Sequence, residues 1–336
     1  MSGENRNVKS IGRYLGEHTI LVALLVMWAL LFVSTDRFRS MDNFLSILQE
    51  ASFIGISGLG MTFCIITGGL DLSSGSLIAL LAVVNMLLLR ATDSFLAIPV
   101  VLLLGALLGA FNGLLVSKVR IPAFITTLAT FYIFRALAYI ITGGDPVTYN
   151  AAWFIWLGNG SILGVPFSFL LMIVLAIVAH LILRRTQIGR SVVALGNSPE
   201  AARISGLNND RATIFAFLMV GLTVAISSVL LSSRLWSANP RMLDGYEFRV
   251  ITAVVLGGTA LEGGKGSIFN TVIASIFYCS ISNAMTLYRV DSYVISIVTG
   301  IILLLAFSLN PIKQILDERN NKKAVARSKA VSGGAK

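Results

Sequence analysis

The sequence predicts an all-α membrane protein with about ten spanning helices, and its composition and long apolar stretches carry that prediction. Apolar residues make up 56% of the 336 residues, and charged residues only 12%. A soluble domain carries about 25% charged residues, so this chain could not cover its own surface in water. Several apolar stretches also exceed the roughly 18 residues that mark a membrane-spanning helix.

Breaks that carry glycine, proline or charge divide the apolar sequence into ten predicted spans, of which the third and eighth are short. The spans lie at about 19–35, 44–67, 75–89, 94–117, 121–142, 166–183, 212–233, 248–261, 267–288 and 292–309. We therefore expect three parts in the chain: an N-terminal segment at 1–17, a transmembrane domain at 18–310 and a basic tail at 311–336.

The distribution of lysine and arginine predicts which side each loop faces. With the N-terminus inside and ten spans, inner segments hold 18 basic residues and outer segments hold 7. Cytoplasmic loops of membrane proteins are enriched in these residues, so we expect both termini in the cytoplasm. The same rule accounts for the net charge of +10 without a nucleic-acid partner. The basic tail is suited to contact anionic lipid headgroups.

Two glycine-rich breaks look alike and predict an internal repeat. Each follows an apolar span, contains one acidic residue and leads into the next span through glycine and serine. The glycines are Gly68, Gly69 and Gly75 in the first break, and Gly257, Gly258, Gly263 and Gly264 in the second. Paired broken helices in transporters lie beside the transport path, although two short glycine stretches can also match by chance. We expect Gly69 and Gly258 to permit close packing of helices.

The inner loop between the sixth and seventh spans predicts a short helix at about 199–205. Ser198 is a good N-cap, and Pro199 suits the first helical position. Glu200 complements the helix dipole, and Gly206 is a natural stop. An ordinary connecting loop is the alternative, but it needs no such signals in this order. A helix lying across the inner surface is suited to contact a partner.

Several polar residues lie at membrane depth and are candidates to line a pathway. Asp71 either caps the helix that Ser73 begins or lines a gate. Arg135 either snorkels to the interface or lines a cavity. The remaining candidates either bind a polar solute or bond a neighbouring helix, and they are Asn85, Asn112, Thr126, Thr127, Thr130 and Asn283.

The chain resembles the ribose-type permeases, which are the membrane subunits of ABC importers for simple sugars. The resemblance runs in order from about 20 to 310. It rests on the loop at 189–208 and on GMT at 60–62, GGLDLSSGS at 68–76, NG at 112–113, IPAFITTL at 121–128, TGGDPV at 142–147 and AVVLGGT at 253–259. The chain departs from the family where Ala129, Ala136, Asn270 and Ala274 replace glycine.

This resemblance implies a permease dimer, of two copies or of this chain and a paralogue, that encloses one pathway. A periplasmic sugar-binding protein would dock outside, and ABC ATPase domains would dock inside at about 196–208. The implied ATPase-coupling residues are Asn197, Ser198, Pro199, Glu200, Ala201, Ala202, Arg203 and Gly206. The resemblance also implies the bacterial inner membrane as the location.

Ligands bound by the chain itself are not expected. The glycines before Lys265 do not have the spacing of a phosphate-binding loop, so ATP and Mg²⁺ would bind to the partner ATPase. No metal-ligand spacing or catalytic constellation is present, which disfavours a membrane-embedded enzyme. A secondary carrier or channel for a small polar solute remains the alternative. The sequence leaves open whether the substrate is ribose, allose, xylose, galactose, galactofuranose or a cyclic autoinducer.

Overall fold

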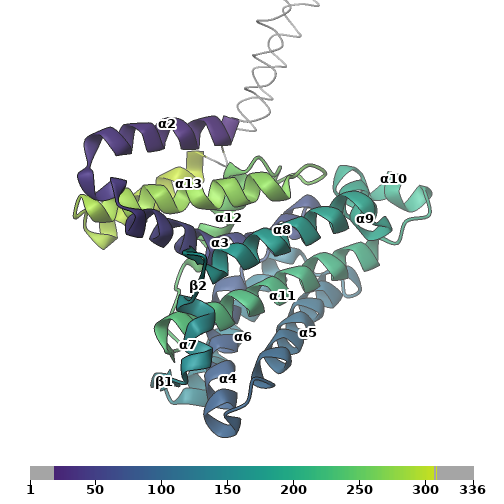
Figure 1. The fold of residues 1–336 in the computed structure, drawn as a ribbon. Coiled ribbons are helices and arrows are strands. Elements are labelled where there is room, and N and C mark those ends of the chain that lie inside the picture. Colours follow the sequence, from purple (N-terminus) through teal and green to yellow (C-terminus); the bar gives the residue numbers. More distant parts are fainter. Residues whose placement is uncertain (1–18, 306–307, 309–336) are drawn as a thin grey trace, which may run out of the picture. The chain divides into compact units, whose positions relative to one another are not determined.

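A computed structural model describes residues 19–305 and residue 308 (Figure 1). Its contacts divide the chain into two units, residues 1–291 and 292–336, and each is considered by itself. The predicted N-terminal segment at 1–17 and the basic tail at 311–336 lie outside the described residues. The described residues are mostly helical, as expected.

Seven helices of the described residues are long and apolar enough to cross a membrane, and each corresponds to a predicted span. They are α3 (Met41–Ile66), α4 (Ser74–Thr92), α5 (Ala97–Ser117), α6 (Ala123–Thr142), α8 (Phe167–Arg185), α11 (Asn209–Leu235) and α13 (Ile268–Leu287). The third predicted span is longer than expected, because α4 extends over 19 residues. The protein is therefore a multi-pass membrane protein.

The other three predicted spans differ from a full membrane helix. Helix α2 (Thr19–Ser34) and the helix Ser292–Leu305 are apolar but shorter, and residues 306–307 and 309 of the tenth predicted span lie outside the described residues. The helix predicted at 248–261 is present but shorter than expected, because it ends at Leu256. Helix α12 (Tyr246–Leu256) has 11 residues, so it is about 16 Å long, roughly half the thickness of a bilayer core. It stops because Gly257 and Gly258 end it.

Short elements connect the long helices. They are η1 (Asp36–Arg39), β1 (Val147–Thr148), α7 (Ala152–Asn159), β2 (Ser161–Ile162), β3 (Val165–Pro166), α9 (Gln187–Asn197), α10 (Pro199–Ile204) and β4 (Ser237–Ala238). Strand β1 pairs antiparallel with β4, and β2 pairs antiparallel with β3. We call the end of unit 1 that carries α10 the α10 end, and the end that carries the β1–β4 pair the β1 end.

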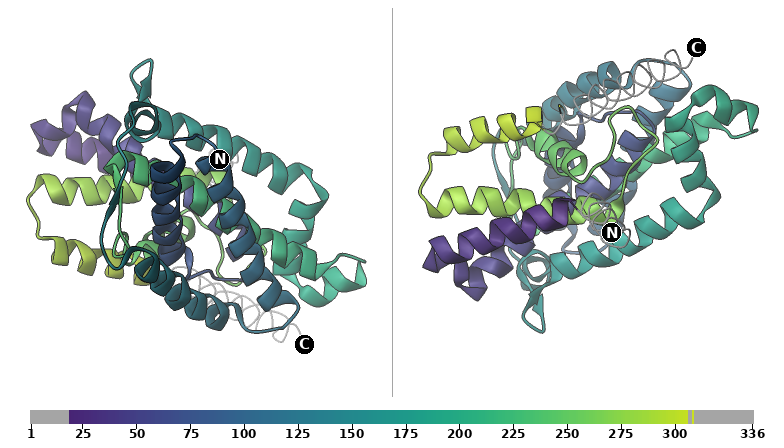
Figure 2. Two further views of the ribbon diagram at one scale, coloured as in Figure 1. Left: turned by 90° about the horizontal axis from the view of Figure 1, so that it is seen from below. Right: turned by 90° about the horizontal axis from the view of Figure 1, so that it is seen from above.

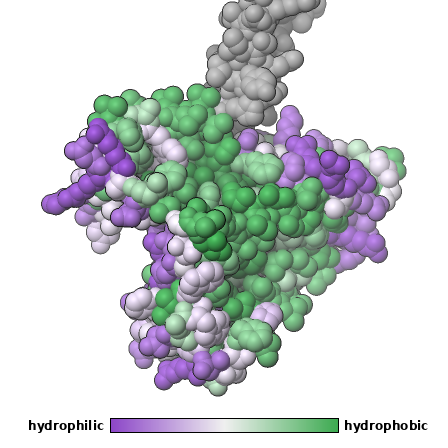
Figure 3. Space-filling model, viewed as in Figure 1, coloured by the Kyte–Doolittle hydropathy of each residue, from purple (hydrophilic) through white to green (hydrophobic). Residues whose placement is uncertain are grey.

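Contacts group the predicted inner loops at the α10 end and the predicted outer loops at the β1 end. At the α10 end, Lys118 after α5 forms an ion pair of 2.6 Å with Asp210 at the start of α11. At the β1 end, Val147 pairs with Ala238 across the two strands. Figures 1 and 2 agree in placing α10 far from η1. Figure 3 shows a hydrophobic band over α8, α11 and α5 between two hydrophilic regions, as expected for helices in a bilayer.

Glycines on α5 and α11 bring these two helices into backbone contact. Gly105, Gly109 and Gly113 recur every fourth residue on the α5 face that meets α11. A Cβ added to Gly109 would lie 2.9 Å from the backbone of Gly221, and a Cβ on Gly221 would lie equally close to Gly109. Helices in membranes associate closely through small residues at this spacing. The packing fixes α11 at the buried centre of unit 1, beside α3 and α4.

Candidate functional site

The two glycine breaks end their helices in the same way. Gly68 after α3 and Gly258 after α12 have positive φ angles of 80° and 82°. In each break the next amide, that of Gly69 or Thr259, donates to the carbonyl oxygen five residues earlier, at 3.1 and 3.3 Å. This bond belongs to the Schellman motif, which ends helices at a glycine. The same geometry also ends α10 at Gly206, so it identifies a common helix stop, and the internal repeat stays a prediction.

The structure corrects the expected role of Gly258, whereas at Gly69 there is little room for a side chain. No atom lies within 4 Å of a Cβ added to Gly258, so the expectation of close packing there is wrong. The constraint on Gly258 is its positive φ, which side chains other than hydrogen disfavour. At Gly69 the nearest atom is the Cys64 Sγ, at 3.2 Å. Close packing occurs instead at Gly257, where a Cβ would lie 2.9 Å from the backbone of Asn270.

The two breaks contact each other at the α10 end. The Gly264 amide of the second break donates to the carbonyl oxygen of Ile66, the last residue of α3, at 2.8 Å. The carbonyl groups of the last helical turn have no partner within their own helix. The second break therefore supplies a hydrogen bond that α3 alone could not make.

Asp71 forms hydrogen bonds at the start of α4, and residues of α5 and α6 form hydrogen bonds to the same segment. Its Oδ1 accepts hydrogen bonds from the Ser73 amide at 2.8 Å and the Ser73 hydroxyl at 2.6 Å. Asn112 of α5 donates to the Ser73 hydroxyl at 3.0 Å, and Thr127 of α6 donates to the Leu70 carbonyl at 3.2 Å. Asp71 is 1% exposed, and its Oδ2 has no hydrogen-bond partner among the described residues. Asp71 thus orders the start of α4 through one of its carboxylate oxygens.

Glu247 is a buried carboxylate that the sequence analysis did not single out. It lies in the first turn of α12, and its side-chain oxygen Oε2 has no hydrogen-bond partner among the described residues. A Cβ on Gly75 would overlap the Glu247 carboxylate, so a side chain there would displace the carboxylate. The carboxylate therefore faces the N-terminal turn of α4, where the helix dipole favours negative charge. The sequence signal that could have identified Glu247 is its position as an acidic residue directly before the predicted apolar span at 248–261.

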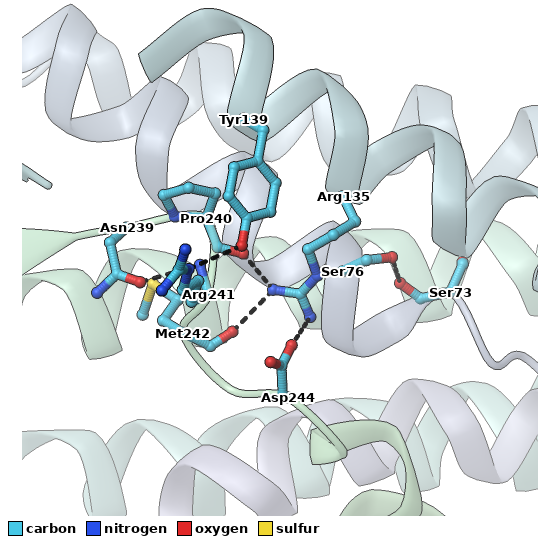
Figure 4. Close-up of polar contacts among 9 residues, drawn as sticks. All are labelled: Ser73, Ser76, Arg135, Tyr139, Asn239, Pro240, Arg241, Met242 and Asp244. Atoms are coloured by element: carbon cyan, nitrogen blue, oxygen red, sulfur yellow. Dashed lines mark hydrogen bonds and ion pairs between the residues drawn. The ribbon is translucent and has the colours of Figure 1, made fainter. Parts of the chain in front are cut away.

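Arg135 clamps the segment between β4 and α12 onto α6 (Figure 4). Its Nη1 donates to the carbonyl oxygens of Pro240 and Met242, and its Nη2 lies 2.9 Å from the Asp244 carboxylate. Nearby, Arg241 Nε donates to the Tyr139 hydroxyl at 3.1 Å. The Arg135 side chain is 12% exposed, so it binds this segment rather than snorkelling to the interface.

The other polar candidates bond neighbouring helices or their own. Asn85 donates to the Ser232 hydroxyl at 3.2 Å, and Asn283 exchanges two hydrogen bonds with Asn43. Thr130 donates to its own helix at the Thr126 carbonyl, 3.1 Å away. The Thr126 hydroxyl is buried and has no hydrogen-bond partner among the described residues. The structure thus brings Asp71, Ser73, Asn112 and Thr127 together, but it places Asn85 and Asn283 in separate helix contacts.

The predicted short helix is present as α10, preceded by α9, which the sequence analysis did not predict. Ser198 Oγ accepts from the Ala201 amide at 3.2 Å, Pro199 occupies the first turn, and Gly206 has a φ of 76°. The side chains of Glu200 and Arg203 form an exposed ion pair of 2.7 Å. The helix, its cap and its stop are therefore as predicted. Ala202 is the buried residue of α10.

Helix α9 forms despite two glycines and two valines, which are weak helix formers. Thr186 caps it by accepting from the Gly189 amide at 3.1 Å. A Cβ on Gly189 would lie within 3.0 Å of the backbone of Leu183, so α9 folds tightly back on the end of α8. A Thr-x-x-Gly capping pattern was the only local signal.

Comparison with known proteins gives consistent matches over most of the chain. The family described as "Branched-chain amino acid transport system / permease component" matches residues 43–307. The ribose import permease protein RbsC of Haemophilus influenzae is 38% identical over 91% of this chain and 96% of its own length. RbsC of Bacillus subtilis is 35% identical over 90% and 93%. The L-arabinose transport system permease protein AraH of Escherichia coli is 35% identical over 93% and 96%. No solved structure matches the chain.

Removing the Arg135 clamp should loosen the segment 239–244. Met242 is 8% exposed, so a cysteine introduced by Met242→Cys should react slowly with a maleimide. Adding Arg135→Ala should speed labelling about tenfold, because charge-assisted hydrogen bonds are worth roughly 1.5–3 kcal/mol. Arg241→Ala, which removes one exposed bond, is the control and should change the rate little. Equal labelling with and without Arg135 would contradict the clamp.

Proposed function

The chain belongs to the family of transport-system permease components, and on this premise we propose that it forms the translocation pathway of an ATP-driven importer for a simple sugar. The identity of 38% to a ribose import permease over 91% of the chain carries the proposal. The family description names branched-chain amino acids, so the sugar specificity rests on the relatives, which are named for ribose or arabinose.

The permease works with partners that supply energy and substrate. It pairs with a second copy or a paralogue in the inner membrane, and it has no catalytic role of its own. An ABC ATPase, which binds ATP and Mg²⁺, docks at the α10 end, and a periplasmic sugar-binding protein docks at the β1 end. A cytoplasmic location of the α10 end is supported by its basic residues. They are Lys118, Arg120, Arg184, Arg185, Arg190, Arg203, Arg211 and Lys265.

The pathway lies beside the first break, at the start of α4. Asp71, Asn112 and Thr126 each keep a buried side-chain oxygen without a hydrogen-bond partner among the described residues. A sugar hydroxyl can donate to such oxygens once the opening of the pathway exposes them, and each bond is weak enough to be released. The segment 239–244 that Arg135 holds lies on the β1 side of this region and closes it toward the outside.

Transport measured with purified components tests the proposal. The permease is reconstituted in liposomes with its ABC ATPase and binding protein, and uptake of labelled ribose, arabinose and leucine is followed. We expect ATP-dependent uptake of a pentose and none of leucine. Leucine uptake would contradict the sugar assignment. Pentose uptake by the permease alone, without ATP or binding protein, would show a secondary carrier instead.

Exchanging the charges of the α10 ion pair tests the docking surface. The exchange Glu200→Arg with Arg203→Glu keeps an exposed ion pair within α10, and the reversed charges oppose the helix dipole by only about 0.3–1 kcal/mol each, so the protein should still fold. It reverses the charges that a partner meets. We expect the ATPase to be lost from the tagged permease on purification and uptake to fall at least about tenfold, as for rim charges that each cost a kcal/mol or more.

The control is the same exchange in η1, Asp36→Arg with Arg39→Asp, a second exposed pair at spacing three. It lies far from α10, so the ATPase should stay bound. If both exchanged proteins retained the ATPase and showed normal uptake, α10 would not be part of the docking surface.

A further inference from the structure

The C-terminal end of α9 lies against both glycine breaks. A Cβ added to Gly196 would lie within 3.0 Å of the Ile66 carbonyl group and of the Gly264 amide nitrogen. A Cβ on Gly263 would lie 3.0 Å from the Gly196 carbonyl oxygen and from the Gly68 amide nitrogen. Three segments that are far apart in sequence thus meet through their backbones.

Asn197 adds a side-chain bond to this contact. Its Nδ2 donates to the Val193 carbonyl of α9 at 2.8 Å and to the Gly264 carbonyl of the second break at 3.3 Å. The Gly264 amide in turn bonds Ile66 of the first break at 2.8 Å. Gly264 is therefore held from both sides, by α9 through its carbonyl and by α3 through its amide.

Only one residue separates this contact from α10. Ser198 ends α9, where its amide donates to the Ala194 carbonyl at 3.1 Å, and begins α10, where its hydroxyl accepts from Ala201. Asn209 at the start of α11 donates to the Pro199 carbonyl at 2.9 Å. A displacement of α10 cannot be absorbed by a flexible linker, so it must move the end of α9.

We propose that Asn197 is a positioning residue that couples α10 to both breaks, and that the backbone contact of Gly196 with Ile66 and Gly264 is the point of transfer. This inference rests on the proposed function, because it assumes that a partner ATPase moves α10. It changes the role of Asn197 from contact with the partner to control of the second break. A displacement of α9 moves Gly264 and, through the hydrogen bond to Ile66, the end of α3.

The test separates this role from a general contribution to folding. Asn197→Ala removes both donated bonds, and Asn208→Ala is the matched control. Asn208 lies in the same connection and caps α11 by accepting from the Arg211 amide at 2.9 Å. Each variant loses side-chain bonds of comparable strength at the α10 end, but only Asn197 bonds a break. The readout is labelled ribose taken up per ATP hydrolysed, in liposomes that contain the ATPase and the binding protein.

We expect Asn197→Ala to retain the ATPase and to hydrolyse ATP, with ribose uptake per ATP at least about fivefold lower. Asn208→Ala should keep the ratio of the unaltered protein. Gly196→Ala should lower the ratio further, and if it fails to fold, Asn197→Ala decides. An unchanged ratio in Asn197→Ala, or an equal fall in Asn208→Ala, would overturn the inference alone. Absence of ATP-driven uptake by the unaltered complex would overturn the proposed function and this inference with it.

Discussion

The hydrogen bond from the Gly264 amide to the Ile66 carbonyl is the contact on which the arrangement of the breaks depends. A helix that stops inside a membrane protein leaves carbonyl groups without partners, and each unpaired group in an apolar medium costs several kcal/mol. The second break satisfies one such group of α3, and its own helix ends with the same motif. Each break is therefore stable where it is because the other lies against it.

The glycines around the two breaks are constrained for different physical reasons. At Gly196 there is no room for a side chain, because the backbones of both breaks pass too close. At Gly258 there is room, but the backbone has a φ of 82°. At Gly75 a buried carboxylate, Glu247, occupies the space. One residue type thus serves three physical purposes around the breaks, and a shared glycine composition does not reveal which purpose applies.

Much of this architecture could be predicted from local sequence signals. Ser198, Pro199 and Gly206 predicted α10 because a cap, a first-turn proline and a stop act within a few residues. Seven spans could be placed because their apolar length is a local property. The end of α12 was missed because Gly257 and Gly258 lie inside an apolar stretch, although the glycine pair was visible. The spacing of Gly105, Gly109 and Gly113, at every fourth residue of α5, is a further local signal of close helix packing. The contact of Gly196 with Ile66 could not be predicted, because it joins residues whose proximity only the tertiary packing creates.

Amide hydrogen exchange of the permease in lipid nanodiscs, followed by mass spectrometry over residues 257–267, tests this account most directly. Gly258, Glu262 and Lys265 are exposed, so water reaches the segment. The amides of Gly258, Thr259, Ala260, Gly263 and Gly264 are nonetheless hydrogen-bonded, the last of them to Ile66. The account predicts exchange of this segment that is slow compared with an unstructured peptide. Exchange as fast as that of a free loop would contradict it, because the second break would then not be held against the first.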